Sequence, residues 1–295
     1  MIPRKSSAPL LSDNSRTVLK APAKINLSLK VLGRRPDGFH ELVSLMAAVS
    51  LADEIILAGA EEDRITFDCP WPVDEGFLDQ NLVMRAIKGF RAVTGQPGFL
   101  SAHVIKNIPL GAGLGGGSSD AAAVLKHLNK NGVLSPAELQ ALALDLGSDV
   151  PFGLGPPLAV ARGRGQTISP WSGPLPPPYA VLINPGCHLS TGLVFRKLGL
   201  TKEFWRNNLS PDLDRNVPEI GQNDLLAPAL ALCPGLKEVM AAAASLGGEA
   251  YGLSGSGPTF WILFGREQKA LTALEEVRGL NTGWWITFSR LILAN

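Results

Sequence analysis

Cysteine is scarce in this sequence, and the few cysteines present exclude two kinds of protein. The 295 residues contain three, at Cys69, Cys187 and Cys233. Because they are scattered, odd in number and never spaced as Cys-x-x-Cys, we expect neither a disulfide framework nor a zinc site. This cysteine usage fits a reducing compartment, and we predict a cytoplasmic protein.

Net charge and long apolar runs are lacking as well. Lys and Arg number 27 and Asp and Glu number 26, which leaves a formal net charge of +1. Without a basic stripe or a patch of interleaved aromatic residues, nucleic acid is not an expected partner. No apolar run approaches the roughly 20 residues that a membrane-spanning helix needs. The first twenty residues contain no apolar core, so we expect neither a secretory signal nor a membrane partner.

Glycine, by contrast, is concentrated in one segment, residues 109–120. Five glycines lie within seven residues, at Gly111, Gly113, Gly115, Gly116 and Gly117. Glycine allows positive φ and a close approach of the backbone to a ligand. The segment continues with residue types that cap helices and then with apolar residues at helical spacing. A glycine-rich loop that enters a helix predicts an anion site, and phosphate is the usual anion.

The common phosphate-binding motifs do not account for this loop. It formally satisfies GxGxxG, but residues 131–135 lack the acidic residue that a dinucleotide site carries about 20 positions on. A P-loop needs Gly-Lys-Ser or Gly-Lys-Thr, whereas this loop has Gly-Ser-Ser. A protein-kinase glycine loop lies between two strands, whereas this one enters a helix. The remaining interpretation is a loop that binds a nucleoside triphosphate and belongs to none of these families.

Strand and helix patterns alternate without βαβ regularity, which indicates an α+β fold. Residues 25–31 alternate strictly between apolar and polar, and Lys24 and Asn26 share the polar face of that strand. Residues 53–57 and 64–67 have the pattern of short strands. Helical spacing covers residues 81–93, and a capping box with proline at its first position opens a second helix at Ser135.

The composition shifts to glycine and proline around residues 153–178, where we place a domain boundary. We expect an N-terminal domain of residues 1–163 that contains the glycine-rich loop. A C-terminal domain of residues 164–295 would follow, with a last strand free to pack back on the first domain. The polar segment 201–221 is expected to be a mobile insert.

Four motifs, taken together, resemble those of one superfamily of kinases. Residues 109–122 resemble the phosphate-binding motif of the GHMP kinases, the superfamily of galactokinase, homoserine kinase and mevalonate kinase. Ser254, Gly255, Ser256 and Gly257 resemble its C-terminal motif, which supports the active site beside the triphosphate. Residues 21–27 with 35–40, and residues 146–151, are similar to a GHMP family that phosphorylates a cytidine-diphosphate-linked methylerythritol.

This resemblance implies both a fold and a reaction. The fold is a two-domain α+β GHMP kinase fold, with a ribosomal protein S5 domain 2-like N-terminal domain and a ferredoxin-like C-terminal domain. The reaction is ATP-dependent phosphorylation of the substrate's 2-hydroxyl, a step of the non-mevalonate route to isoprenoids. Mg²⁺ would arrive with the nucleotide, and no residues suggest a metal site built by the protein alone.

The catalytic pair that the resemblance implies falls on Lys24 and Asp149. A tertiary alcohol is a poor nucleophile, so a carboxylate within hydrogen-bond reach must accept its proton. A nearby ammonium keeps that carboxylate ionised and stabilises developing negative charge. From residue type alone, Asp120 and Asp145 are alternative bases.

Contacts to the two substrates are implied in the same way. Asn26 and Thr191 match polar contacts to the acceptor, Phe39 and Phe195 would stack on its cytosine, and His40 would hydrogen-bond the edge of that base. Ser118 and Ser119 suit phosphate or Mg²⁺, and the sequence does not distinguish between them. The implied ATP-binding positions are Pro109, Leu110, Gly111, Ala112, Gly113, Leu114, Gly115, Gly116, Gly117, Ser118, Ser119, Lys106 and Asn81.

The sequence leaves two alternative functions open. The first is another small-molecule GHMP kinase, acting on homoserine, mevalonate or a sugar. The second is a non-catalytic nucleotide-binding protein of the same fold. In each case the expected partner is a small molecule, bound by a monomer or a homodimer.

Overall fold

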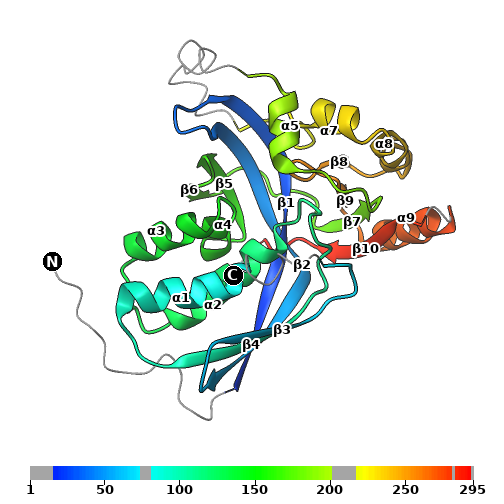
Figure 1. Cartoon of the computed structure of the whole chain (residues 1–295). Helices are drawn as coiled ribbons and strands as arrows, with labels where there is room; N and C mark the ends of the chain where they lie inside the picture. Colours follow the sequence, from blue (N-terminus) through cyan, green and yellow to red (C-terminus); the bar gives the residue numbers. More distant parts are fainter. Residues whose placement is uncertain (1–15, 74–80, 201–216, 281–282, 294–295) are drawn as a thin grey trace. The chain divides into compact units, whose positions relative to one another are not determined.

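A computed structural model describes residues 16–73, 81–200, 217–280 and 283–293, and Figure 1 labels its elements. Most of the predicted insert at 201–221, and most of the first twenty residues, lie outside these ranges. The chain divides into two compact units, and each is assembled from segments that are separate in sequence. The first unit comprises Met1–Ala23, Leu51–Leu110 and Gly116–Leu154, and the second comprises Lys24–Ser50, Gly111–Gly115 and Gly155–Asn295.

The strands of the first unit belong to a mixed sheet. β3 (Arg64–Asp68) runs parallel to β4 (Phe99–Ile105). β4 pairs antiparallel with residues 54–60 of β2 (His40–Ala60). Lys106 directly follows β4, so this strand delivers the chain to the glycine-rich loop.

Four helices accompany these strands: α1 (Leu82–Thr94), α2 (Gly116–Leu128), α3 (Pro136–Leu146) and α4 (Val150–Leu154). They contact one another and lie together in Figure 1. Phe90 of α1 and Leu125 of α2 are fully buried in one cluster with Ile55 and Leu57 of β2. Burial of these side chains supplies most of the driving force that forms the unit.

The second unit holds the first half of β2 and the strands paired with it. β1 (Arg16–Arg34) pairs with β2. Residues 42–47 of β2 pair antiparallel with β5 (Leu158–Gly163), which pairs antiparallel with β6 (Thr167–Pro170). The sequence predicted only short strands in this region. β2 is instead one strand of 21 residues, because its two halves pair with different partners.

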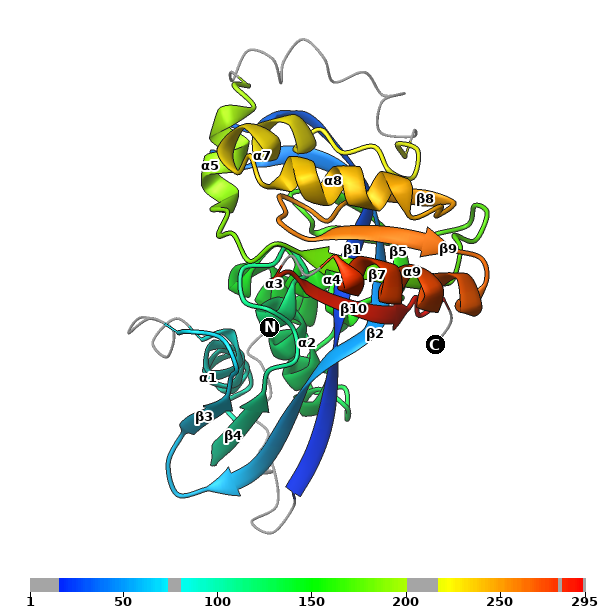
Figure 2. The same cartoon turned by 90° about the vertical axis from the view of Figure 1, so that its right-hand side faces the viewer.

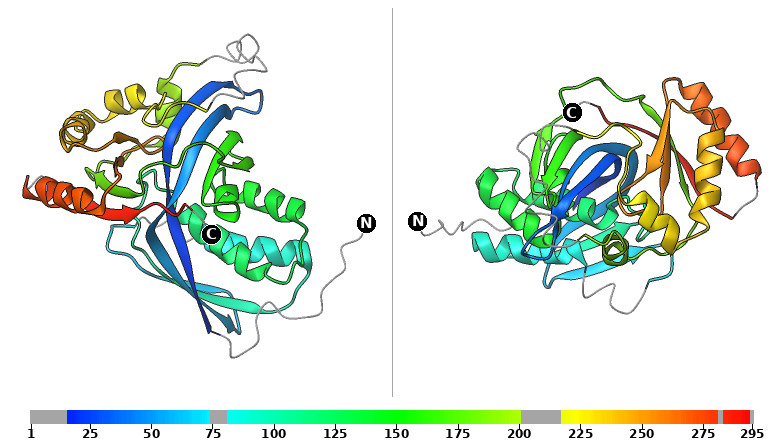
Figure 3. Two further views of the ribbon diagram at one scale, coloured as in Figure 1. Left: turned by 180° about the vertical axis from the view of Figure 1, so that it is seen from behind. Right: turned by 90° about the horizontal axis from the view of Figure 1, so that it is seen from above.

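A separate antiparallel sheet of four strands completes the second unit, in the order β10-β7-β9-β8. Its strands are β7 (Tyr179–Asn184), β8 (Ala250–Leu253), β9 (Phe260–Phe264) and β10 (Trp285–Arg290). Its helices are α5 (Thr191–Lys197), α7 (Leu226–Leu232), α8 (Leu236–Ser245) and α9 (Glu267–Gly279). Figures 2 and 3 show α8 and α9 along the same face of this sheet. The order and the helix placement are those of a ferredoxin-like βαββαβ unit, and the predicted α+β class is confirmed.

Local side-chain caps define the starts of two helices, of which the sequence predicted the one at Ser135. The Asn81 side chain accepts a hydrogen bond from Val83 N and caps α1, and Ser135 forms the predicted capping box with Glu138. The start predicted for α2 is wrong. That helix begins at Gly116, before the serines that were expected to cap it, because Gly116 and Gly117 take helical conformations.

The cysteines form one bridge that the sequence did not predict, although a single bridge is not the disulfide framework that the sequence excluded. Cys187, which follows β7, and Cys233, which ends α7, form a disulfide with their Cα atoms 7.1 Å apart. The two are 46 residues apart in sequence, so only tertiary packing brings them together. Among the described residues, no helix combines the length and the apolar character needed to cross a membrane.

Candidate active site

The glycine-rich loop uses positive φ at three of its five glycines. Gly111, Gly113 and Gly115 have φ values of 62°, 76° and 69°. A Cβ on Gly113 would lie 2.5 Å from Ser254 O and 2.7 Å from Gly257 O. No side chain fits at that distance from two backbone oxygens, so Gly113 is required by close approach as well as by φ.

The predicted third motif holds this part of the loop. Ser254 Oγ donates to Gly113 O at 2.9 Å and accepts from Asn26 N at 3.2 Å. Thr259 N donates to Ala112 O at 3.3 Å. Strand β1, residues 111–115 and the third motif therefore form one cluster, although they are far apart in sequence.

Lys24 lies within this cluster and is only 6% exposed. Its backbone N donates to Leu114 O at 2.9 Å, and its Nζ donates to Asn26 Oδ1 at 2.7 Å. A Cβ on Gly115 would lie 3.0 Å from both Cγ and Cε of Lys24. The ammonium is thus placed beside a loop whose conformation suits an anion, as expected for a group that stabilises negative charge.

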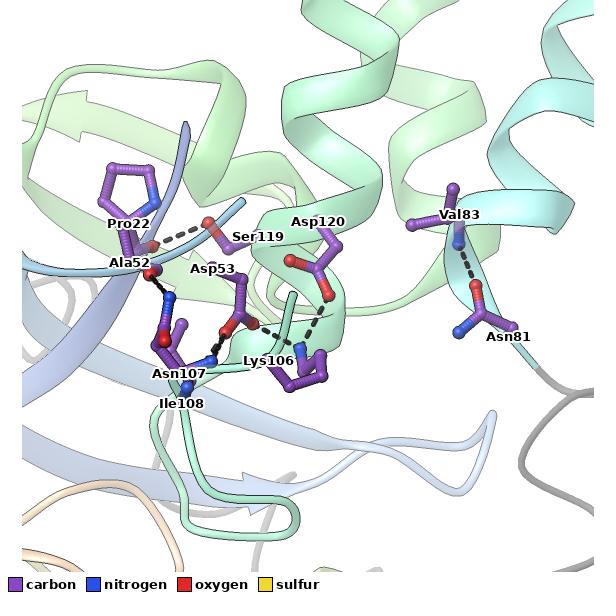
Figure 4. A network of polar contacts seen from close by, with 10 residues as sticks. All are labelled: Pro22, Ala52, Asp53, Asn81, Val83, Lys106, Asn107, Ile108, Ser119 and Asp120. Carbon is purple, nitrogen blue, oxygen red and sulfur yellow. Dashed lines mark hydrogen bonds and ion pairs between the residues drawn. The ribbon is translucent and has the colours of Figure 1, made fainter. Parts of the chain in front are cut away.

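A second polar group lies in the first unit, where the chain enters and leaves the glycine-rich loop (Figure 4). Lys106 Nζ is paired with Asp53 Oδ2 and with Asp120 Oδ2, the latter at 2.7 Å. Asp53 Oδ1 accepts from the backbone N–H groups of Asn107 and Ile108 at 2.6 and 2.8 Å. One buried carboxylate on β2 therefore holds the chain before the loop and, through Lys106, the first turns of α2.

Burial governs the charges of this group. It raises the pKa of Asp120 to about 7, with the Lys106 charge opposing the shift and the Asp53 charge adding to it. Burial alone would lower the pKa of Lys106, but Asp120 and Asp53 outweigh it and raise that pKa. Asp120 Oδ1 is buried and has no hydrogen-bond partner in the described part of the chain, which fits a protonated carboxyl.

Other predicted residues of the first unit have defined positions. Ser119 Oγ donates to Pro22 O at 2.6 Å, which occupies its hydroxyl proton (Figure 4). Asn81 caps α1 through its Oδ1. Asp149 directly precedes α4.

Three residues that were predicted to bind the substrate's cytosine, Phe39, His40 and Phe195, lie in the second unit and take part in two ring contacts. The rings of His40 and Phe195 stack with centroids 4.6 Å apart and an interplanar angle of 24°. Phe39 is 46% exposed, and the Arg164 guanidinium lies 4.6 Å from its ring centroid. In the described part of the chain, Phe39 and Phe195 thus each contact a different partner. Burial, and secondarily the charge of Arg34, lowers the pKa of His40.

Thr191, the first residue of α5, is linked to the third motif by a hydrogen bond of 3.0 Å between its Oγ1 and Ser256 Oγ. Three further side chains near the predicted site carried no motif in the sequence. Ser44 hydrogen-bonds Asn26, Arg164 covers Phe39, and the His188 ring lies against Gly111. Their roles depend on contacts between distant segments, which local patterns do not encode.

Comparison with known proteins agrees with this architecture. The profile of the GHMP kinases N terminal domain matches residues 81–155, and the profile of the GHMP kinases C terminal region matches residues 208–280. With the glycine-rich loop held by the third motif, these matches define a GHMP kinase.

Whole-chain relatives narrow the class. The chain is 39% identical to 4-diphosphocytidyl-2-C-methyl-D-erythritol kinase of Methylobacterium radiotolerans, over 92% of this chain and 98% of the relative. It is 38% identical to the enzyme of that name from Cereibacter sphaeroides, with the same coverage. A solved 4-(cytidine 5'-diphospho)-2C-methyl-D-erythritol kinase shares 37% identity at a TM-score of 0.73, over 93% of this chain and 99% of that one. The chain belongs to the 4-diphosphocytidyl-2-C-methyl-D-erythritol kinase family.

Proposed function

We propose that this chain transfers the γ-phosphoryl group of ATP to the 2-hydroxyl of 4-diphosphocytidyl-2-C-methyl-D-erythritol. The observation that carries the proposal is the buried Lys24 ammonium beside residues 111–115 of the glycine-rich loop. A fixed cation at a phosphate loop suits transfer of a phosphoryl group, in which positioning and electrostatics supply most of the catalysis. The name that the relatives share supports the choice of acceptor.

Asp149 is the proposed general base. The acceptor hydroxyl oxygen attacks the γ-phosphorus, its proton passes to the Asp149 carboxylate, and the bond from the γ-phosphorus to the β–γ bridging oxygen breaks to release ADP. Lys24 stabilises the negative charge that develops during this transfer. General-base assistance of this kind is typically worth about 10² to 10⁴ in rate.

The glycine-rich loop and the N-terminus of α2 form the proposed triphosphate site. The N–H groups at the start of a helix bind phosphate without further side chains. Of the two serines that the sequence left open, Ser118 is the proposed donor to phosphate, because the Ser119 hydroxyl proton is used by Pro22 O. The oxygen of either hydroxyl can still coordinate Mg²⁺ through a lone pair. Hydroxyl and phosphate oxygens are hard ligands that suit Mg²⁺, which when bound neutralises phosphate charge. Asn81 and Lys106 stay predictions for the adenine end of the nucleotide.

The acceptor side of the proposal uses the flat side chains and the polar residues of the second unit. Phe39 and Phe195 offer ring faces for the cytosine, and His40 offers a ring nitrogen to its edge. The lowered pKa of His40 keeps its imidazole neutral near pH 7, so it can either donate or accept. Asn26 and Thr191 complete the proposed polar contacts.

We further propose a cytoplasmic enzyme that acts as a monomer or a homodimer and takes no nucleic acid partner. The net charge of +1 supports the last point. The proposed sequence domains, 1–163 and 164–295, are supported by the two family profiles, which match on opposite sides of that boundary.

Release of ADP in the presence of different acceptors tests the proposed function. The wild-type chain is supplied with ATP, Mg²⁺ and, in separate reactions, the cytidine substrate, homoserine, mevalonate or galactose. We expect rapid ADP release with the cytidine substrate and not with the other three acceptors. Equal or faster release with another acceptor would favour a different GHMP kinase, and ATP binding without release on any acceptor would favour a non-catalytic protein.

A further inference from the structure

A chain of hydrogen bonds leads from Lys24 into the sheet between β1 and β2. Lys24 Nζ donates to Asn26 Oδ1 at 2.7 Å, and Asn26 Nδ2 donates to Ser44 Oγ at 2.8 Å. Ser44 Oγ in turn donates to Ser28 O at 2.6 Å. Ser44 is completely buried, so water cannot replace its hydroxyl.

The direction of this chain is fixed by its two ends. A backbone carbonyl such as Ser28 O can only accept, so the single hydroxyl proton of Ser44 is used there. Ser44 Oγ must then accept from Asn26, and only the Nδ2 end of the amide can donate to it. The Oδ1 end is left facing Lys24, and an ammonium can only donate.

Other contacts of Asn26 fix its backbone but not its amide. Asn26 N donates to Ser254 Oγ, and Asn26 O accepts from Trp261 Nε1 at 2.9 Å. The two ends of an asparagine amide are nearly equal in size, so packing alone does not select one orientation. If Nδ2 faced Lys24 instead, two donors would oppose each other in a buried site.

We infer that Ser44 is a positioning residue for the phosphoryl transfer, which orients the Asn26 amide so that its oxygen holds the Lys24 ammonium. The inference rests on the proposed function, because Lys24 matters as the cation at the phosphate loop. Ser44 does not touch either substrate in this role. It acts only through Asn26.

A matched pair of serine variants tests the assignment. Ser44→Ala removes the orienting hydroxyl, whereas Ser28→Ala removes a buried hydroxyl that has no hydrogen-bond partner in the described part of the chain and leaves the Ser28 carbonyl in place. A hydrogen bond to a charged group is worth enough that we expect kcat of Ser44→Ala to fall about 10- to 100-fold. KM for ATP should stay within about twofold, and Ser28→Ala should match the wild type. Equal kcat values for the two variants would overturn the inference.

A second background separates orientation from packing. In Asn26→Asp, both side-chain oxygens are acceptors, so either one can face Lys24 and no orienting group is needed. We therefore expect Ser44→Ala to change kcat by less than about twofold in the Asn26→Asp background, well below its effect in the wild type. The same fold-loss in both backgrounds would show that Ser44 acts through packing, and would overturn the assignment.

An NMR measurement tests the role of Ser44 without relying on turnover. The Asn26 side-chain NH₂ should exchange slowly with solvent in the wild type and in Ser28→Ala, and faster in Ser44→Ala. Unchanged exchange in Ser44→Ala would contradict the inference even if kcat falls. If the wild type fails to phosphorylate the cytidine substrate, the proposed function fails, and this exchange measurement still decides what Ser44 does to Asn26.

Discussion

Ser254 Oγ donates a hydrogen bond to Gly113 O at 2.9 Å, across 141 residues of sequence. This contact joins the third motif to the glycine-rich loop, and Asn26 N donates to the same hydroxyl oxygen. The conformation of the loop is therefore set by distant segments as well as by its own glycines. Substitutions that disturb this packing should weaken ATP binding before they destabilise the rest of the fold.

Gly113→Ala should abolish tight ATP binding. The new Cβ would lie 2.5 Å from Ser254 O, so the loop must move, and a displacement of this size near reacting groups can cost about 10²-fold in kcat/KM. Gly132→Ala is the matched control, because Gly132 has a similar φ of 67° but no atom within 4 Å of a Cβ. The control should lose about 1–2 kcal/mol of stability and keep its activity. Equal ATP affinities by calorimetry for the two variants would contradict this reading of the loop.

Lys106→Met should be strongly destabilising. It leaves the buried Asp53 carboxylate and the Asp120 carboxyl group without their shared cation, and breaking a buried pair costs about 3–5 kcal/mol. Lys20→Met is the control. Lys20 pairs with Glu54, which follows Asp53 on β2, but the Lys20 side chain is 65% exposed. Such surface pairs contribute about 0–1 kcal/mol. Urea denaturation measures both, and similar losses would rule out a structural role for the buried group.

Asp120 should make stability fall as the pH rises from about 4 to 7. Its pKa is about 7 in the folded protein and about 3.8 as an ordinary carboxyl, so the folded chain binds the extra proton between these values. Stability from this group is complete below the lower value and is lost as the pH rises through the upper one. The unfolding free energy of the wild type, minus that of Asp120→Asn, should decline over this range. A difference that is flat or that rises with pH would contradict a protonated Asp120.

Asp149→Asn should retain ATP binding and lose turnover. Without a base for the hydroxyl proton, kcat should fall by at least about 100-fold. Asp145→Asn is the control, because Asp145 is exposed on α3 and was an alternative base by residue type alone. Steady-state kinetics with calorimetry of ATP binding checks both variants. Near-normal activity in Asp149→Asn would remove that residue from the mechanism.

Much of the fold follows from local patterns in the sequence. The capping box at Ser135 was readable, because it depends on residues within one turn. The cap at Asn81 is equally local but was not predicted. The length of β2 was not readable, because its halves are stabilised by pairing with β4 and β5, which are distant in sequence. The start of α2 was misplaced because serine outranks glycine as a cap, whereas the loop packing here lets Gly116 begin the helix.

The candidate site, like the fold, could be predicted only in part. Glycines with required φ and the motif around Lys24 were visible, since a loop at a phosphate must use such residues. The pairing of Lys106 with Asp53 and Asp120 was not visible, because the partners are 53 and 14 residues away. Ser44 lies in an apolar run of β2 and gains its role only through its contact with Asn26.

Phosphorus-31 NMR of the reaction mixture tests the proposed reaction most directly. The wild-type chain is incubated with ATP, Mg²⁺ and 4-diphosphocytidyl-2-C-methyl-D-erythritol, and the phosphate resonances are followed over time. We expect the γ-phosphate signal of ATP to be replaced by an equal amount of a new phosphomonoester on the 2-hydroxyl of the acceptor. Persistence of ATP, or its hydrolysis to free phosphate with the acceptor unchanged, would contradict the proposed kinase activity.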